Sequence, residues 1–300
     1  MNKFIFNLRR LKSKIAKRFD GVLMDYGREI LSNEKGSEVI YNALKEDKPL
    51  FVGRLGAGEM RMLEFYLSNW DFDFIKEMLE NNTGFFPPTN ENIKKLAKEY
   101  IEALKKVDIL GVWYNPLEDF VVKKFAKDAI LVTSGAIHTP FFAKKPWSEA
   151  LEGKKVLVIH PFSESIKKQY QKRKLLFQNP KILPEFELDI LKAVQTIAGN
   201  RDERFKSWFE ALEYMKKEIE KKDFDIAIIG AGAYGFPLGA FVKSLGKKAI
   251  HMGGSTQLLF GIRGKRWDER DEFKRLFNKH WIRPIEKPKN FKRVENGCYW

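Results

Sequence analysis

The sequence predicts an α/β fold: a Rossmann-like, mostly parallel sheet with helices on both faces, plus a basic amphipathic N-terminal helix. Short apolar runs of strand length alternate with helical patterns of about a dozen residues, as a parallel sheet requires. Glycine-rich turns follow two of these runs. The chain has 300 residues, of which 44% are hydrophobic, and this is enough for a large core.

The pattern of basic and apolar residues in the stretch 1–22 predicts the basic amphipathic helix. No continuous apolar core follows the charges, so the stretch lacks the pattern of a signal peptide. Two interpretations stay open: the helix lies in the plane of an anionic cytoplasmic leaflet, or it is an amphipathic first helix that packs on the domain. Lysines and arginines surround the apolar residues of that face, which are Phe4, Ile5, Leu8, Leu11, Ile15 and Phe19.

We expect residues 23–280 to form a single α/β catalytic domain, because no linker or repeat divides this stretch. Residues 175–200 are irregular, and residues 281–300 form an aromatic and basic C-terminal tail. Thr89 is expected to cap a helix that ends near Val107. Further helices are expected at 35–47, 57–70 and 203–222, strands at 49–56, 109–115 and 156–160, and a strand, glycine turn, helix and strand over 223–254.

The charge balance predicts a partner rich in phosphate. The chain has 55 lysines and arginines against 40 aspartates and glutamates, a formal charge of +15. Nucleic acid, an anionic membrane and nucleotide-bearing substrates all suit this charge. The single cysteine, Cys298, excludes an intrachain disulfide and favours a reducing, cytoplasmic compartment. No stretch reaches the roughly 20 apolar residues of a membrane span.

The residues that follow each apolar run are the candidates for a site, because ligands of open α/β sheets bind at the carboxyl ends of the strands. Gly230, Gly232 and Gly235 match the G-x-G-x-x-G pattern between a strand and a helix. The next strand ends in His251 and Met252, without the acid that holds a ribose in nicotinamide enzymes. The loop predicts a phosphate or nucleotide site, with close packing of helix on sheet as the structural alternative.

Two other strand ends carry polar groups. His160 is a candidate base or ligand, or else a buried polar group near the core. Ser163 would hold a phosphate at a helix start, or only cap that helix. Gly254, Ser255 and Gln257 would hydrogen-bond a sugar or ribose, with a helix cap as the alternative.

The stretch FVGRLGAGE, residues 51–59, brings an arginine to a strand end and a glutamate to a helix start. Arg54 offers a forked cation for a diphosphate, and Gly56 and Gly58 leave the backbone beside it open. Glu59 is a candidate base, metal ligand or favourable first-turn anion.

This stretch resembles the R-x-G-x-x-E signature of the D-type glycosyltransferase fold, whose bacterial members use sugar nucleotides. Arg54, Gly56 and Glu59 match, whereas the Asp of the family's Asp-x-Glu motif is Ala57 here. The layout of strand edges over residues 40–270 is also similar. In that family the acidic pair is associated with a divalent cation, manganese or magnesium, and with the donor diphosphate. With Glu59 alone, positive side chains and helix N-termini are the alternative means of neutralising the diphosphate.

The combined prediction is a cytoplasmic glycosyltransferase, peripheral on the inner face of the membrane, in surface polysaccharide or glycan assembly. It would transfer a sugar from a nucleotide-sugar donor to a glycan or lipid-linked acceptor. Glu59 or His160 would accept the proton of the acceptor hydroxyl. The alternatives are an S-adenosylmethionine- or nucleotide-dependent enzyme that uses the GAGAYG loop, and a basic nucleic-acid-binding protein. No specific nucleic acid is expected, because no recognisable module appears.

Overall fold

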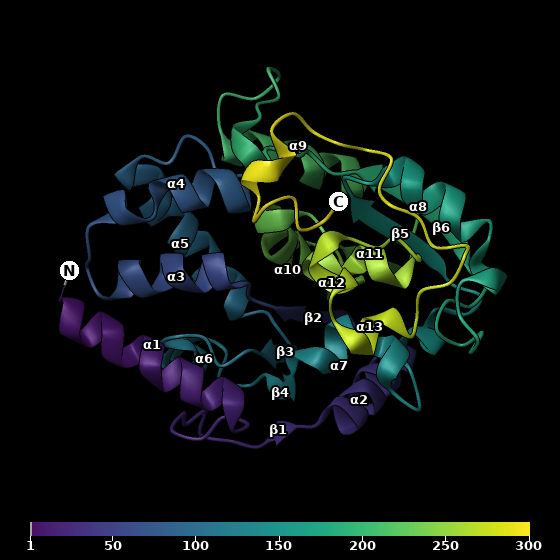
Figure 1. Ribbon diagram of the computed structural model, residues 1–300, viewed down its shortest axis with the longest axis horizontal. Coiled ribbons are helices and arrows are strands. Elements are labelled where there is room, and N and C mark those ends of the chain that lie inside the picture. Colours follow the sequence, from purple (N-terminus) through teal and green to yellow (C-terminus); the bar gives the residue numbers. More distant parts are fainter. Residues whose placement is uncertain (1) are drawn as a thin grey trace.

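A computed structural model describes residues 2–300 and shows one eight-stranded sheet between two layers of helices (Figure 1). The strand order is β1-β4-β3-β2-β8-β7-β5-β6, and all the pairings are parallel. The predicted α/β class is therefore confirmed. The strands are β1 Ile30–Leu31, β2 Leu50–Arg54, β3 Ile109–Val112, β4 Ile130–Thr133, β5 Lys155–His160, β6 Glu187–Lys192, β7 Ile226–Ile229 and β8 Lys248–His251.

The two faces of the sheet have separate hydrophobic cores, because successive strand side chains point in opposite directions. In β7, Ala227 and Ile229 join one core, and Ile226 and Ile228 join the other. The first core is closed by α3 Ala57–Leu67, α4 Lys76–Met78, α5 Asn90–Leu104, α6 Glu118–Phe125, α9 Trp208–Glu220 and α10 Gly235–Ser244. The second is closed by α2 Asn33–Lys45, α7 Ser134–His138, α8 Ser163–Tyr170, α11 Thr256–Leu259, α12 Lys265–Asp268 and α13 Asp271–Lys274.

Local capping explains where several helices begin. Thr89 caps α5 as predicted, since its hydroxyl accepts the backbone N–H of Asn92 at 3.1 Å. Helix α9 begins at Trp208 and not at the expected residue 203, because Ser207 caps it by accepting the N–H of Glu210. Strand β6 lies in the stretch that was expected to be irregular.

After the parallel strands β2 and β8, the chain turns towards opposite faces of the sheet. These strands pair side by side in the middle of the sheet. Helix α3, which follows β2, covers one face, whereas α11, which follows β8, covers the other. Such a divergence opens a crevice at the carboxyl ends of the strands, where ligands of doubly wound sheets bind.

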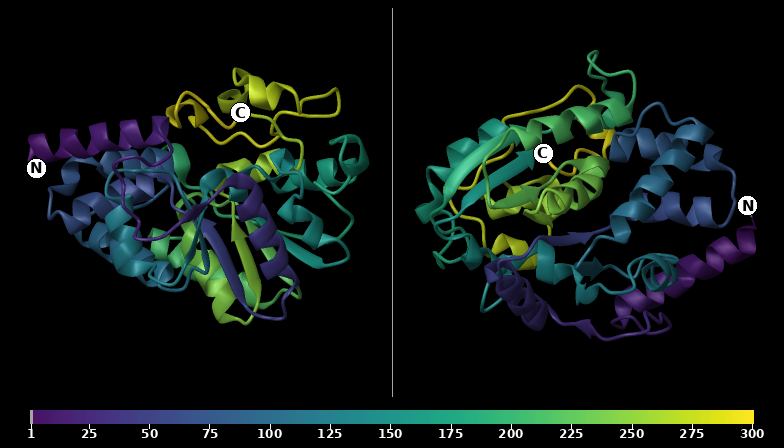
Figure 2. Two further views of the ribbon diagram at one scale, coloured as in Figure 1. Left: turned by 90° about the horizontal axis from the view of Figure 1, so that it is seen from below. Right: turned by 180° about the vertical axis from the view of Figure 1, so that it is seen from behind.

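The predicted N-terminal helix is present as α1, Lys3–Arg18, at the periphery of the molecule (Figure 2). It packs on the protein through Phe6, Ser13 and Ala16; the Phe6 ring centroid lies 5.8 Å from that of Trp70, and the Ser13 hydroxyl donates to the carbonyl of Tyr114. None of the helices within residues 2–300 has the length and hydropathy needed to cross a bilayer.

The apolar stripe of α1 points away from the domain. Phe4, Leu8 and Leu11 are 74%, 54% and 55% exposed, and Phe19 is 55% exposed. On a helical wheel Phe4, Leu8 and Leu11 lie on the side opposite Phe6 and Ser13, which pack on the protein. The helix therefore packs on the domain, as one of the two interpretations expected, and it does so with its apolar stripe exposed; its attachment to a membrane stays a prediction.

The last 20 residues wrap over the carboxyl ends of the strands (yellow in Figure 1). The Nε1 of Trp300 donates to the carbonyl of Glu286 at 2.7 Å, and Arg283 donates to the carbonyl of Trp300. Gln257 donates to the carbonyl of Tyr299 at 3.1 Å and thereby fixes the end of this segment to the loop after β8. The C-terminal segment thus forms part of the surface where ligands are expected.

Candidate functional site

A central cleft opens at the carboxyl ends of β2 and β8. It has a cavity volume of about 520 Å³. Pockets for drug-sized ligands hold roughly 300–1,000 Å³, so the central cleft has room for a ligand of this size. Its walls come from the strand ends of β2 and β8, the start of α3, and the segments of α12, α13 and the C-terminus.

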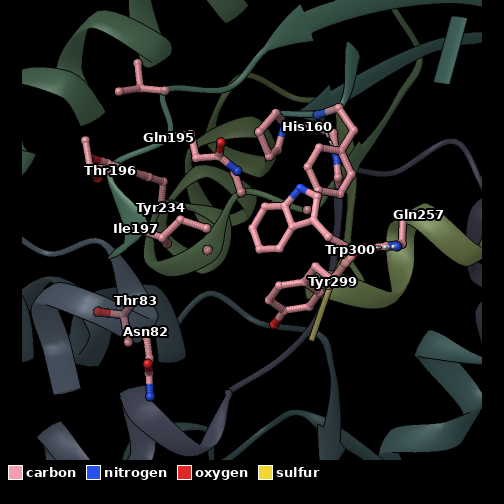
Figure 3. A pocket seen from close by; sticks show the side chains of 17 residues that line it. Asn82, Thr83, His160, Gln195, Thr196, Ile197, Tyr234, Gln257, Tyr299 and Trp300 are labelled. Atoms are coloured by element: carbon pink, nitrogen blue, oxygen red, sulfur yellow. Dashed lines mark hydrogen bonds between the residues drawn. The ribbon is translucent and has the colours of Figure 1, made fainter. Parts of the chain in front are cut away.

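A side pocket adjoins the central cleft over the ends of β5 and β7. The two cavities share a boundary formed by the residues Asn82, Thr83, Gly232, Gly254 and Tyr299. Tyr299 and Trp300 lie next to each other on one side of the side pocket, and Asn82 and Thr83 lie on the other (Figure 3).

Arg54 ends β2 and holds its guanidinium in the central cleft without a protein partner. Its Nε is buried and has no hydrogen-bond partner within residues 2–300, and no described carboxylate lies within 4.0 Å of the group. The Cζ atom lies 5.0 Å from the ring centroid of Trp113, which follows β3. Arg54 is half-buried, and a partly desolvated cation that forms no ion pair in the described chain suits an anionic ligand.

Gly253 makes the position of Arg54 possible. A Cβ atom on Gly253 would lie 2.0 Å from Nη2 of Arg54, which is far inside van der Waals contact. The φ angle of Gly253 is +64°, in the left-handed region that favours glycine. The loop after β8 thus forms a wall without side chains against which the guanidinium lies.

Glu59 lies beside Arg54 in the first turn of α3. Gly56 is the N-cap, and a Cβ there would lie 2.1 Å from Oε2 of Glu59 and 3.0 Å from Nη1 of Arg54. The side chains of Glu59 and Arg54 therefore both lie over Gly56, near each other but without an ion pair in the described chain. Ala57 is exposed at the rim of the same cleft.

Two histidines stand next to Arg54: His251 is buried, and His138 is half-buried. Nδ1 of His251 lies 3.1 Å from the carbonyl oxygen of Arg54, and its Nε2 is buried without a partner in the described chain. The ring centroid of His138 lies 5.2 Å from that of Trp113. Burial lowers the pKa of both histidines to about 3, and the Arg54 charge adds to the effect. Both rings are therefore neutral at pH 7.

His160 lies in the side pocket, apart from Glu59. Its Nδ1 accepts the backbone N–H of Phe162 at 3.0 Å, which leaves the ring proton on Nε2. Burial lowers its pKa to about 3. The neutral ring therefore offers an N–H donor to the pocket, and the role of His160 as a base stays a prediction.

The structure brings most of the predicted site residues together in one of the two cavities. Gln257, one of these residues, also makes structural hydrogen bonds: its Nε2 donates to the carbonyls of Ile262 and Tyr299. Its Oε1 is buried without a partner within residues 2–300. The residues of the central cleft are Arg54, Gly56, Gly58, Glu59, Gly232, Gly254 and Ser255, and those of the side pocket are His160, Gly230, Gly232, Gly254 and Gln257.

Two predicted phosphate ligands lie outside both cavities. Phe162 is the N-cap of α8, so Ser163 is its first helical residue and does not cap it. The free N–H groups of Glu164 and Ser165 donate to the Glu286 carboxylate at 2.8 and 3.1 Å, so this helix start already holds an anion. Gly235 packs against His251, since a Cβ there would lie 2.4 Å from Nε2. Neither residue is retained as a phosphate ligand.

Several cleft residues were not predicted. Trp113 and His138 come from the ends of β3 and α7, and Arg61, Arg266 and Arg270 come from three different helices or loops. Trp113 follows an apolar run directly, so the strand-end rule offered a signal for it. The arginines had no such signal, because only the tertiary fold brings them to the cleft.

The acids of the cleft do not fit a divalent cation. Such ions take several oxygen ligands, usually including carboxylates. Glu59 is beside the Arg54 cation, and the preceding motif position is Ala57. Within residues 2–300 there is no group of three or more His, Cys, Asp or Glu side chains placed to hold a metal ion.

Comparisons with known proteins identify the fold. Residues 31–259 match the model of the GT-D fold-like domain. A solved structure of the domain of unknown function 1792, described as a distinct glycosyltransferase fold, superposes with a TM-score of 0.50 at 14% identity and covers 97% of this chain and 94% of that one. A selenomethionine form of this domain gives a TM-score of 0.48 at 14% identity, with 98% and 94% covered. A comparison with curated proteins finds no match.

Proposed function

Because the chain belongs to the family of GT-D fold-like domains, we propose that it is a glycosyltransferase that uses a nucleotide-sugar donor. The observation that carries this proposal is Arg54, a cation without a partner at the switch point between β2 and β8. A diphosphate offers the paired oxygens that a guanidinium binds with two parallel hydrogen bonds. The sugar nucleotide would therefore place its diphosphate beside Arg54.

The side pocket is suited to the nucleoside. Aromatic rings of Tyr299 and Trp300 form one wall, and His160 presents an N–H donor. The unpartnered Oε1 of Gln257 is a free acceptor in the described chain. Aromatic faces and a few fixed polar groups are the usual means of recognising a planar base.

Glu59 is the proposed base for the acceptor hydroxyl. In the transfer, the bond between the anomeric carbon and the diphosphate oxygen breaks, and that oxygen keeps the electron pair. The acceptor oxygen forms the new bond to the anomeric carbon while its proton passes to Glu59. Arg54, which lies over Gly56 near Glu59, would stabilise the charge that develops on the departing oxygen.

The acceptor is proposed to be a glycan or a lipid-linked saccharide of surface polysaccharide or glycan assembly. The exposed apolar stripe of α1, with Lys3, Lys14 and Arg18 beside it, suits a helix lying in an anionic membrane surface. Peripheral attachment to the inner, cytoplasmic face would bring a lipid-linked acceptor near the enzyme. Sedimentation with vesicles tests this attachment.

A thermal-shift panel tests the donor class. The purified protein is heated with nucleoside diphosphate sugars, nucleoside diphosphates, S-adenosylmethionine and NAD. A ligand that binds only the folded state raises the melting temperature. At a concentration of 100 times its Kd, it adds about 2.7 kcal/mol to the free energy of unfolding. We expect a shift with one nucleoside diphosphate and its sugar conjugates. A shift with S-adenosylmethionine or NAD alone would contradict the proposal.

A further inference from the structure

Four arginines line the central cleft against two glutamates. The arginines are Arg54, Arg61, Arg266 and Arg270, and the glutamates are Glu59 and Glu295. The histidines of the cleft do not alter this balance, because their lowered pKa keeps them neutral. The lining therefore carries a formal excess of positive charge that matches the two negative charges of a nucleoside diphosphate sugar.

Two of the four arginines form ion pairs with glutamates in the described chain, and the other two do not. Arg54 has no described carboxylate partner, and no ion pair within residues 2–300 includes Arg61. Arg266 pairs with Glu295, and Arg270 pairs with Glu272, which is 46% exposed. Exposed ion pairs contribute only about 0–1 kcal/mol. A diphosphate can therefore take over the Arg270 contact at little cost.

The Arg54 guanidinium already places a positive charge near the Glu59 carboxylate. Nη1 of Arg54 and Oε2 of Glu59 both lie within 3.0 Å of the point that a Cβ of Gly56 would occupy. A divalent cation on Glu59 would stand next to this guanidinium, with Ala57 offering no oxygen. Like charges at such short range repel each other, so Arg54 and a cation compete for the same place.

From this geometry we propose that the cleft binds the donor diphosphate through arginines alone, without a divalent cation. Arg54 and Arg61 approach from the side of β2 and α3, and Arg270 approaches from α13. When the bond to the anomeric carbon breaks, the leaving oxygen keeps its electron pair, and its charge is held by these guanidiniums. The inference rests on the proposed function and adds how the donor is held and which arginines hold it, Arg270 of the C-terminal part of the chain among them.

Calorimetry with the nucleoside diphosphate selected by the thermal-shift panel tests this inference. The titration is run once in EDTA and once with manganese. We expect the two Kd values to agree within about twofold, because the arginines supply the charge. A Kd at least about tenfold tighter with manganese would overturn the inference but leave the proposed function standing. Failure of all nucleoside diphosphates to bind in either buffer would overturn both.

Single-residue variants test which arginines contact the diphosphate. Arg270→Ala should weaken binding in EDTA by about three- to tenfold, since it removes one cation that contacts the diphosphate. Arg204→Ala, which removes an exposed arginine paired with Asp202 away from the cleft, is the matched control and should leave the Kd unchanged. An unchanged Kd in Arg270→Ala would remove this residue from the assignment.

Ala57→Asp restores the acid of the family motif. Because Ala57 is exposed at the rim, the new carboxylate can be accommodated without disturbing the core. It should weaken nucleoside diphosphate binding in EDTA by about threefold or more through repulsion, and manganese should restore it. Ala57→Asn, which has the same shape but no charge, should show neither effect. If Ala57→Asp behaves as the parent protein does in both buffers, the charge balance proposed for the cleft is wrong.

Discussion

At the residue scale, the site depends on contacts that few side chains could replace. Arg54 lies between the ring of Trp113 and the backbone of Gly253, and its carbonyl contacts His251. The motif predicted Arg54 and Glu59 because they are close in sequence. It could not predict Trp113 or His251 as their neighbours, because these residues lie 54 or more positions away in the sequence and only the sheet order brings them together.

Replacing Arg54 should separate binding from folding. Arg54→Ala removes charge-assisted hydrogen bonds worth about 1.5–3 kcal/mol, so the Kd for the nucleoside diphosphate should rise by about 10- to 100-fold. Arg54→Lys should be intermediate, because lysine keeps the charge and loses the fork. Calorimetry gives the Kd values, and Arg204→Ala is the control. An unchanged Kd in Arg54→Ala would exclude Arg54 as a diphosphate ligand.

Replacing Gly253 tests the wall behind Arg54. Gly253→Ala adds a Cβ at 2.0 Å from Nη2 and forces alanine into the left-handed region, so it should displace the guanidinium and weaken donor binding. Gly246→Ala is the matched control, because Gly246 has a φ angle of +77° and nothing within 4 Å of the added Cβ. Both variants should lose about 1 kcal/mol or more of stability through strain, measured by urea unfolding. Equal donor affinity in the two variants would show that the Arg54 contact does not matter.

At the scale of elements, periodicity predicted most helices and strands but not the shortest or most exposed ones. Strand β1 has only two residues, and β6 lies at the edge of the sheet with half-exposed side chains, so neither shows a strong apolar run. The amphipathic pattern predicted α1 correctly. It could not say which side of the helix meets the protein, because Ser13 and Ala16 on the packed side carry no strong hydrophobic signal.

The exposed stripe of α1 gives a prediction that separates membrane binding from stability. Leu8→Ser with Leu11→Ser should abolish sedimentation with anionic vesicles at low salt. Stability should change by less than about 0.5 kcal/mol per site, because both side chains are already exposed. Leu175→Ser, at a site 51% exposed and distant in sequence, is the control and should sediment like the parent protein. Sedimentation that persists in the double variant would contradict the role of α1.

At the scale of the whole molecule, the alternation of helices between the two faces produces the binding edge. Chain segments after β2 and β8 diverge, and so do those after β7 and β5, which places the central cleft and the side pocket next to each other. The parallel class and the strand-end location of the site were predictable from local patterns. The strand order was not, because it depends on packing between segments far apart in the chain.

Buried histidines should make the whole protein sensitive to acid. The pKa values of His138, His160 and His251 are about 3 in the folded state, against an ordinary value of about 6.5 in the unfolded chain. The unfolded state therefore binds more protons below pH 6.5, and stability is lost as the pH falls from about 6.5 towards 3. Each histidine contributes about 1.4 kcal/mol per pH unit in this range. Glu118 opposes the loss, because burial raises its pKa.

Urea unfolding at pH 7.5 and pH 5 measures this loss. We expect a clearly lower urea midpoint at pH 5, because the buried His160 and His251 together cost about 4 kcal/mol there, a large share of the whole stability of many domains. His160→Gln, which cannot bind a proton in this range, should narrow the difference between the two midpoints. Equal midpoints at both pH values would contradict the burial of neutral His160 and His251.

The most direct test of the central claim is a crystal structure with the nucleoside diphosphate that the thermal-shift panel selects. The account predicts that the diphosphate lies in the central cleft, within hydrogen-bond distance of the Arg54 guanidinium and beside Glu59, with the base in the side pocket against Tyr299 or Trp300. A nucleotide bound elsewhere, with Arg54 still unpartnered over Trp113, would contradict the assignment of this cleft as the donor site.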